Sequence, residues 1–374
     1  MSKTNKGTRQ PFLENMSSPS DSVLGPQYKS DYRDSGPELY SSMALPLVSL
    51  IGGCIKEGQH WHTGVEDAPR IIHEAGLQRV LENLGRGVVV AGNVTSIASD
   101  QSRDVVEEGK YTPNEVKNGS KLGEALGRLH HLVRQEADKG NFVLTIGGDH
   151  SVASASISAI KLSCDSRNQK LAVVWVDAHA DCNTPETSGS GNFHGMPVGI
   201  LMGWFKKKVR NFEWIESYLQ APLPENRLAF IGLRDVDEEE KRLLRQSKIL
   251  VYSMIDVERK GISAIMDEIN AEFADSQLHL SFDIDGIDPL YAPGTGTRAK
   301  GGLNYREARY ICTSLASSRR LMSMDLVEVN PSLDNSIPSG NHEHGDNPLV
   351  SPTAPVTVKL AIDLIEFAIG KTLV

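Results

Sequence analysis

Cysteines and long apolar runs are scarce in this sequence of 374 residues. Only four cysteines occur, at positions 54, 164, 182 and 312, and none of them has Cys-x-x-Cys spacing. The sequence therefore predicts a reduced, intracellular protein without a disulfide framework or a zinc knuckle. No apolar run approaches the roughly 20 residues that are needed to cross a bilayer, so no membrane partner is expected.

Basic residues are also in deficit, with 39 Lys and Arg against 48 Asp and Glu and a formal net charge of −9. This balance argues against nucleic acid or an anionic membrane surface as the main partner. Residues 1–45 are polar and lack the apolar segment of a signal peptide, so we predict a disordered N-terminal tail there. Acidic residues such as Glu14 and Asp21 argue against a mitochondrial presequence, and a cytoplasmic location is predicted.

From about residue 46 onward, short apolar runs alternate with amphipathic stretches. Strands that are apolar on both faces and separated by helices indicate a parallel sheet covered on both sides. We therefore predict a single α/β domain over 46–374. Its strands are expected at 47–51, 87–91, 142–146, 171–176, 228–232, 249–253, 278–282 and 321–327, and its helices near 67–83, 120–138, 151–163, 236–246, 259–274 and 304–317.

The segment Asp177-Ala178-His179-Ala180-Asp181 follows the apolar run 171–176. Residues at alternate positions of an extended segment project to the same side, so the two carboxylates and the imidazole are expected to converge. Such a group suits one or two divalent metals of the manganese or zinc kind. The carboxyl ends of strands are also where open α/β sheets bind their ligands. A solvated cluster on a surface turn is the alternative explanation for this segment taken alone.

Two further segments repeat the pattern at the ends of other predicted strands. Asp283 and Asp285 follow the run 278–282, and His150 lies in the glycine-containing turn 147–151. The three segments together supply two histidines and four aspartates, which is enough for two metals and an open position for water. Other histidines are explained without a metal: His342 and His344 by an exposed polar loop, 334–350, and His130 with His131 by the surface of a helix.

Two divalent metals bridged by carboxylates indicate metal-assisted hydrolysis, either of a phosphoester or of a guanidino group. The segment 183–195 offers mostly neutral hydrogen-bonding side chains that suit a zwitterion, and it contains His194, which could carry protons. Glu328 ends the last predicted strand. A carboxylate at that place would hold a guanidinium and repel a phosphate.

These residues make the chain resemble the arginases, ureohydrolases that split L-arginine into L-ornithine and urea. The resemblance runs from about Ser49 to the C-terminus. The matching motifs are 147–151, 177–183, 190–195, 232–237, 281–289, 295–297, 301–307 and 328–333. It implies an eight-stranded parallel sheet with helices on both faces (a three-layer αβα fold), two Mn²⁺ ions per subunit and a homotrimer. In the family, Arg306 and Glu307 match a charged pair at the subunit contact.

The resemblance also implies a role for each site residue. A hydroxide that bridges the two manganese ions attacks the guanidinium carbon, Asp181 helps with the proton, and His194 exchanges protons with solvent. The metal ligands are His150 and Asp181 for one ion, His179 and Asp285 for the other, and Asp177 and Asp283 for both. The substrate residues are Asn183, Ser188, Ser190 and Asn192 at the α-carboxylate, Asp237 near the α-amino group, and Glu328 and Thr297 at the guanidinium end.

Three alternatives remain beside arginine hydrolysis. Agmatinases and other guanidino-acid ureohydrolases keep the metal motifs but usually lack the 183–195 segment that recognises an α-amino acid. A two-metal phosphoesterase is disfavoured by Glu328 and by the neutral segment. A non-catalytic relative would be expected to have lost one or more metal ligands, and all six are present.

Overall fold

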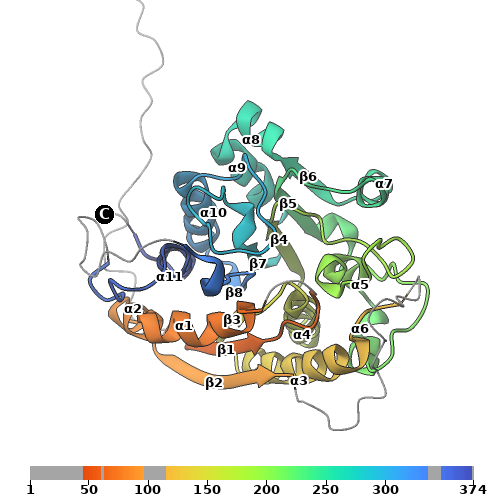
Figure 1. Ribbon diagram of the computed structural model, residues 1–374, viewed down its shortest axis with the longest axis horizontal. Helices are drawn as coiled ribbons and strands as arrows, with labels where there is room; N and C mark the ends of the chain where they lie inside the picture. Colours follow the sequence, from red (N-terminus) through yellow and green to blue (C-terminus); the bar gives the residue numbers. More distant parts are fainter. Residues whose placement is uncertain (1–44, 60–62, 97–114, 336–346, 373–374) are drawn as a thin grey trace, which may run out of the picture. The chain divides into compact units, whose positions relative to one another are not determined.

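Eight parallel strands form the centre of the structure (Figure 1). The computed structural model describes residues 45–59, 63–96, 115–335 and 347–372. The strand order is β2-β1-β3-β8-β7-β4-β5-β6, which confirms the predicted eight-stranded parallel sheet. The strands are β1 (Val48–Cys54), β2 (Val88–Thr95), β3 (Phe142–Gly147), β4 (Leu171–Val176), β5 (Leu228–Leu233), β6 (Leu250–Ser253), β7 (Gln277–Asp283) and β8 (Leu321–Val327).

Two predictions fall largely outside the described residues. The N-terminal tail predicted over 1–45 is one of them, because the described residues begin at 45. The polar loop with His342 and His344 is the other. The folded unit begins at Leu45, and the domain boundary at residue 46 stays a prediction.

The helices follow the predicted stretches with two breaks. The single helix expected near 67–83 is divided at Gly76, whose φ of 124° ends α1, and the stretch near 259–274 is divided at Gly261, with φ 78°. Glycine adopts such angles without steric cost. Within the described ranges, no helix is long and apolar enough to cross a membrane. The helices are α1 (Ala68–Ala75), α2 (Leu77–Asn83), α3 (Gly119–Asp138), α4 (Val152–Ser166), α5 (Pro197–Leu201), α6 (Glu216–Leu219), α7 (Glu238–Gln246), α8 (Met254–Lys260), α9 (Ile262–Glu272), α10 (Tyr305–Ser317) and α11 (Val356–Ala368).

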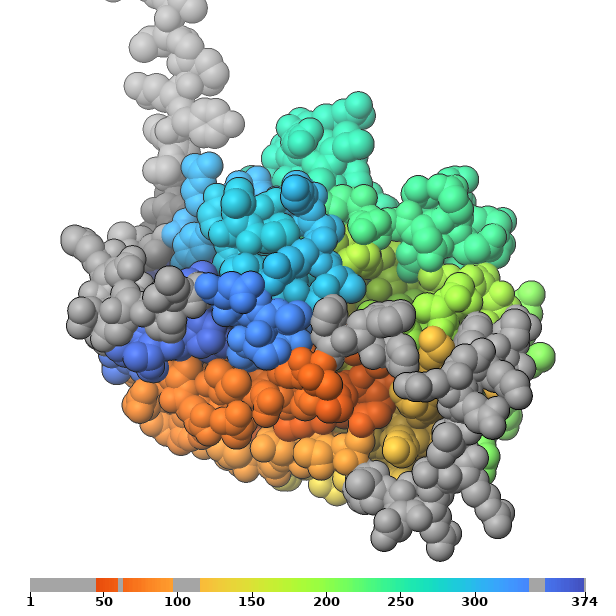
Figure 2. Space-filling view, viewed as in Figure 1, coloured from red at the N-terminus to blue at the C-terminus, as the bar shows by residue number. Residues whose placement is uncertain are grey.

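Two apolar cores, one on each face of the sheet, hold the layers together. Helices α1, α2, α9, α10 and α11 pack on one face, and α3, α4, α5 and α6 on the other (Figure 1). Helix α11 was not predicted, because it is buried on most sides and its sequence has no clear polar face. It packs against α1 and α10, so segments from the two ends of the folded unit lie side by side (Figure 2).

The carboxyl ends of the central strands β3, β8, β7 and β4 meet at one edge of the sheet. Close backbone packing at this edge depends on Gly148, just after β3. A Cβ atom there would lie 2.5 Å from the carbonyl oxygen of Gly53 and closer still to that of Ile55. Glycine is therefore required where the chain leaves β3 toward His150.

His130 is buried, which makes the surface interpretation of this residue wrong. Only 4 % of it is exposed, on the face of α3 that packs against α4, where its Nδ1 lies 2.9 Å from Ser158 Oγ. Its ring also lies against Trp214, while His131 is exposed. Burial, followed by the nearby His131, lowers the pKa of His130 to about 4.

This burial predicts a loss of stability in acid. The unfolded chain takes up a proton on His130 near its ordinary pKa of about 6.5, whereas the folded protein does so only near 4. The free energy of unfolding should therefore fall by about 1.4 kcal/mol per pH unit across this window because of His130 alone. In urea unfolding, the free energy of unfolding of His130→Gln should fall less steeply with decreasing pH than that of wild type. The control His131→Gln should behave like wild type. Equal slopes in all three proteins would contradict the prediction.

Candidate metal centre

All six predicted metal ligands come together at the carboxyl edge of the sheet. They form two overlapping groups in which one ligand atom from each residue lies within 4.8 Å of the others. The first group is His150, Asp177, Asp181 and Asp283, and the second is Asp177, His179 and Asp285. Asp177 belongs to both groups, as expected of a bridging ligand, whereas Asp283 belongs only to the first. The bridging roles of both residues stay predictions.

His150 is at the centre of the first group. Its Nδ1 lies 3.1 Å from a carboxylate oxygen of each of Asp177, Asp181 and Asp283. Within the part of the chain that the structure describes, this buried atom makes no hydrogen bond of normal geometry. Its Nε2 lies 3.0 Å from Ser281 Oγ, and the ring of Trp175 stacks on the imidazole at 4.2 Å. A hydrogen bond at Nε2 leaves Nδ1 available as a metal ligand.

The second group is built around the shared Asp177. His179 Nδ1 lies 3.2 Å from Asp285 Oδ2 and 3.5 Å from Asp177 Oδ1. Thr297 Oγ1 donates a hydrogen bond of 2.6 Å to Asp285 Oδ2. Thr297, predicted at the guanidinium end of the substrate, thus orients a ligand of this group. The side chain of His179 is 24 % exposed, so this group is the more accessible one.

The electrostatics of the two groups fit a pair of cations. Burial, together with the carboxylates of Asp285 and Asp177, raises the pKa of Asp283 well above its ordinary value. Burial opposes protonation of His150, yet the carboxylates around it raise the pKa of that imidazole well above its usual range. Positive charge nearby would therefore stabilise the ionised form of these buried carboxylates. Oxygen and imidazole donors without a thiolate suit manganese among the divalent metals.

Glu328 and His194 lie beside the first group. Glu328 Oε1 accepts a hydrogen bond of 2.9 Å from the backbone N–H of His150, and the same oxygen lies 3.4 Å from His194 Nδ1. Burial lowers and the Glu328 carboxylate raises the pKa of His194, with a net rise to about 9. Glu328 and Asp181 have φ angles of 60° and 47°, which non-glycine residues seldom adopt. Such strain is typical of functional sites.

The predicted substrate segment forms a loop beside these groups. Asn183 Nδ2 donates to Asp237 Oδ2 at 2.8 Å, so the structure brings together two residues that are 54 positions apart. The hydroxyls of Ser188 and Ser190 lie 3.4 Å from each other and accept backbone N–H groups of the loop itself. Asn192 is buried, and its Oδ1 has no hydrogen-bond partner among the described residues. This amide oxygen is available to a ligand.

Sequence reasoning missed several residues that hold the ligands in place. Trp175 Nε1 donates to Asp177 Oδ2 at 2.9 Å, and Ser281 contacts His150. Trp175 and Ser281 each lie two positions before a predicted ligand, Asp177 and Asp283, so a period of two could have revealed them. Glu240 accepts from the backbone N–H groups of Cys182 and Asp237. Its signal was the Asp-x-x-Glu pattern of a capping box at the start of α7.

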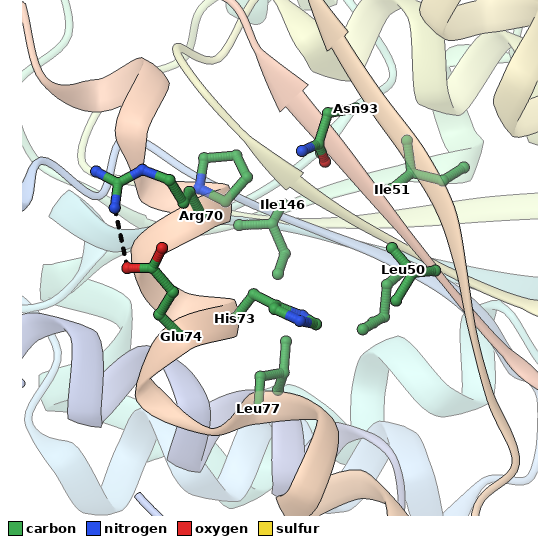
Figure 3. Close-up of a pocket in the computed structure, with 11 residues that line it drawn as sticks. Leu50, Ile51, Arg70, His73, Glu74, Leu77, Asn93 and Ile146 are labelled. Atoms are coloured by element: carbon green, nitrogen blue, oxygen red, sulfur yellow. Dashed lines mark hydrogen bonds and ion pairs between the residues drawn. The ribbon is translucent and has the colours of Figure 1, made fainter. Parts of the chain in front are cut away.

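A separate cavity of about 290 Å³ contains none of these residues. It lies between α1, β1 and β2, and the imidazole of His73 points toward Leu50 and Leu77 (Figure 3). Arg70 and Glu74 form an ion pair of 2.9 Å at its rim. Its mainly aliphatic walls hold no cluster of carboxylates and imidazoles, so the chemistry belongs to the carboxyl edge of the sheet.

Known proteins are similar to this chain in both sequence and fold. The Arginase family matches residues 47–364. The arginase of Plasmodium berghei is 39 % identical over 87 % of this chain and 94 % of that protein, and the arginase of Neurospora crassa 37 % over 96 % and 90 %. The solved structure of Bacillus caldovelox arginase matches with a TM-score of 0.73 and 31 % identity, over 88 % of this chain and all of that one. Entamoeba histolytica arginase, solved in complex with L-ornithine, also has a TM-score of 0.73, at 28 % identity over 88 % of this chain. The chain therefore belongs to the arginase family of hydrolases.

Proposed function

We propose that this protein hydrolyses L-arginine to L-ornithine and urea at a centre of two Mn²⁺ ions. The observation that carries the proposal is the pair of overlapping His and Asp groups that share Asp177, beside a complete 183–194 loop. His150 and Asp181 would hold one ion, and His179 and Asp285 the other, with Asp177 and Asp283 shared. Divalent metals in such sites allow water to ionise near neutral pH and polarise the group under attack.

The protein's own side chains would divide the remaining work. Glu328 would hold the cationic guanidinium, since its carboxylate is buried beside the first group. Asp181 would take part in proton transfer at the reacting carbon. His194 is 22 % exposed and contacts Glu328, so it could exchange protons between the site and solvent.

The other end of the substrate would be recognised by the loop 183–192 and by α7. Asn183, Ser188, Ser190 and Asn192 offer donors and acceptors for an α-carboxylate. Asp237, held by Asn183 and by the first turn of α7, offers a partner for the α-ammonium. A phosphoester substrate is disfavoured, because Glu328 would repel it. The cytoplasmic location and the disordered tail stay predictions from composition.

Metal content is the first test. Asp177→Ala should abolish binding of both ions, because Asp177 belongs to both groups, while His150→Ala should mainly weaken one. Elemental analysis and Mn²⁺ titration of the purified proteins would measure this, with His73→Ala, in the separate cavity, as the matched control. A single tightly bound zinc with no activation by manganese would refute the proposed centre.

His194→Ala should reduce turnover by roughly one to two decades, within the range that general acid–base groups supply. The bound metal should be unchanged, since His194 is in neither ligand group. Urea release and metal content would be measured on the same preparation. Wild-type turnover with an unchanged pH–rate curve would show that His194 is only structural.

Substrate choice separates arginase from agmatinase activity. Agmatine lacks the α-carboxylate, so the polar groups built to pair with it would be left unsatisfied, which can cost several decades in rate. We expect strong preference for L-arginine, and Asn183→Ala or Asp237→Ala should erode it chiefly through weaker binding. Glu238→Ala is the control, because Glu238 is exposed in the first turn of α7, next to Asp237. Comparable urea release from both substrates would overturn the arginase activity but not the ureohydrolase class.

We also propose a homotrimer, on the basis of family likeness. Arg306 and Tyr310 are exposed one turn apart on α10, whereas Glu307 already accepts the N–H of Asn304 in a capping box. Arg306→Ala should therefore shift the protein toward smaller species in sedimentation, and Arg242→Ala, on α7, should not. An active wild-type monomer at low salt would contradict the trimer.

A further inference from the structure

Arg234 ties together segments of the metal centre that are not neighbours in the sheet. It follows β5, and in the order β7-β4-β5 the strand β4 separates it from β7. One terminal nitrogen, Nη2, donates to the carbonyl oxygens of Asp285 at 2.6 Å and Ala299 at 2.8 Å. The other, Nη1, donates to Gly286 at 3.1 Å and to Gly232 at 3.2 Å.

The backbone of the same residue holds the segment from β4. The N–H groups of Arg234 and Asp235 both donate to the carbonyl oxygen of Ala178, at 2.9 and 3.0 Å. Ala178 lies between Asp177 and His179, two members of the second ligand group. Residue 234 thus fixes the main chain on both sides of this group: at Ala178 through its backbone and at Asp285 through its guanidinium.

The contacts of Arg234 are made to carbonyl groups. Among the described residues, the hydrogen bonds of its guanidinium go to backbone carbonyl oxygens, and its Nε is buried without a partner. Its charge nevertheless lies near Asp285, Asp177 and Asp283, the acids that crowd the centre. Space for the guanidinium depends on Gly302, where a Cβ atom would lie 2.6 Å from Nη2.

We propose that Arg234 is a positioning residue that sets up the second ligand group, Asp177, His179 and Asp285, before metal binds. This inference rests on the proposed two-metal centre. Supporting groups around a metal site typically contribute 10- to 100-fold in affinity, since they hold the ligands in the binding geometry. The first group should depend less on Arg234, because His150 and Asp181 receive no contact from it among the described residues.

The test is titration of the metal-free protein with Mn²⁺. Arg234→Lys keeps the positive charge but loses the planar guanidinium, whose two terminal nitrogens donate in fixed directions. It should weaken one of the two sites by about 10- to 100-fold and the other by less than about threefold. Arg320→Lys is the matched control. Arg320 also binds carbonyl oxygens, those of Phe273, Ser276 and Asn270, but it precedes β8 at the opposite edge of the sheet. Arg320→Lys should lower the melting temperature but should not make the Mn²⁺ affinities of the two sites differ from each other more than in wild type.

Equal shifts at both sites in Arg234→Lys, or shifts no larger than in Arg320→Lys, would overturn the inference. A wild-type protein that binds fewer than two Mn²⁺ ions would overturn the proposed centre and the inference with it.

Hydrogen exchange in the metal-free wild type gives a second test that needs no variant. The amides of Arg234 and Asp235, bonded to Ala178, should be protected as strongly as amides in the core of β5. If they exchange as fast as exposed loop amides until Mn²⁺ is added, the group is not set up in advance and the inference fails.

Discussion

Four carboxylates and two imidazoles lie together at one largely buried edge of the sheet. The free-energy cost of burying like charges determines which groups can surround them. Each carboxylate needs hydrogen-bond donors or cations, because an unpaired buried charge is strongly unfavourable. The structure supplies fixed donors: the indole of Trp175 for Asp177, the hydroxyl of Thr297 for Asp285 and backbone N–H groups at the strand ends. These donors do not neutralise the negative charge of the four carboxylates, and divalent cations could balance the remainder.

The same constraint explains the positions of the strained residues. Asp181 and Glu328 have left-handed backbone angles next to His150. Each angle turns a carboxylate from its strand end toward the centre, and the surrounding contacts hold it there: the N–H of Glu328 donates to Gly148 and that of Val198 to the carbonyl of Asp181. The two apolar cores stabilise the sheet that carries these strained residues.

Much of this arrangement could be predicted from the sequence. All eight strands were located. Six of them are buried on both faces and form short apolar runs, and the edge strands β2 and β6 are apolar although partly exposed. The six residues of the two groups were identified because each follows such a run. Family likeness assigned them to the two metal ions, and their roles as ligands stay predictions. Arg234 and Glu240 were missed as supports, since their contacts join segments about 50 residues apart or more. The break of the first helix at Gly76 and the burial of His130 depend on tertiary packing, which local periodicity does not report.

The strand order has a consequence for how the centre can be assembled during synthesis. His150 follows β3, whose neighbour toward the centre is β8, the last strand in the chain. The first group also needs Asp283, at the end of β7. A growing chain that has emerged only as far as β6 has Asp177, His179 and Asp181 on one strand end but no completed sheet between them and His150. Tight metal binding at this centre would therefore be a late event that depends on completion of the fold, and contacts of such long sequence separation favour slow folding.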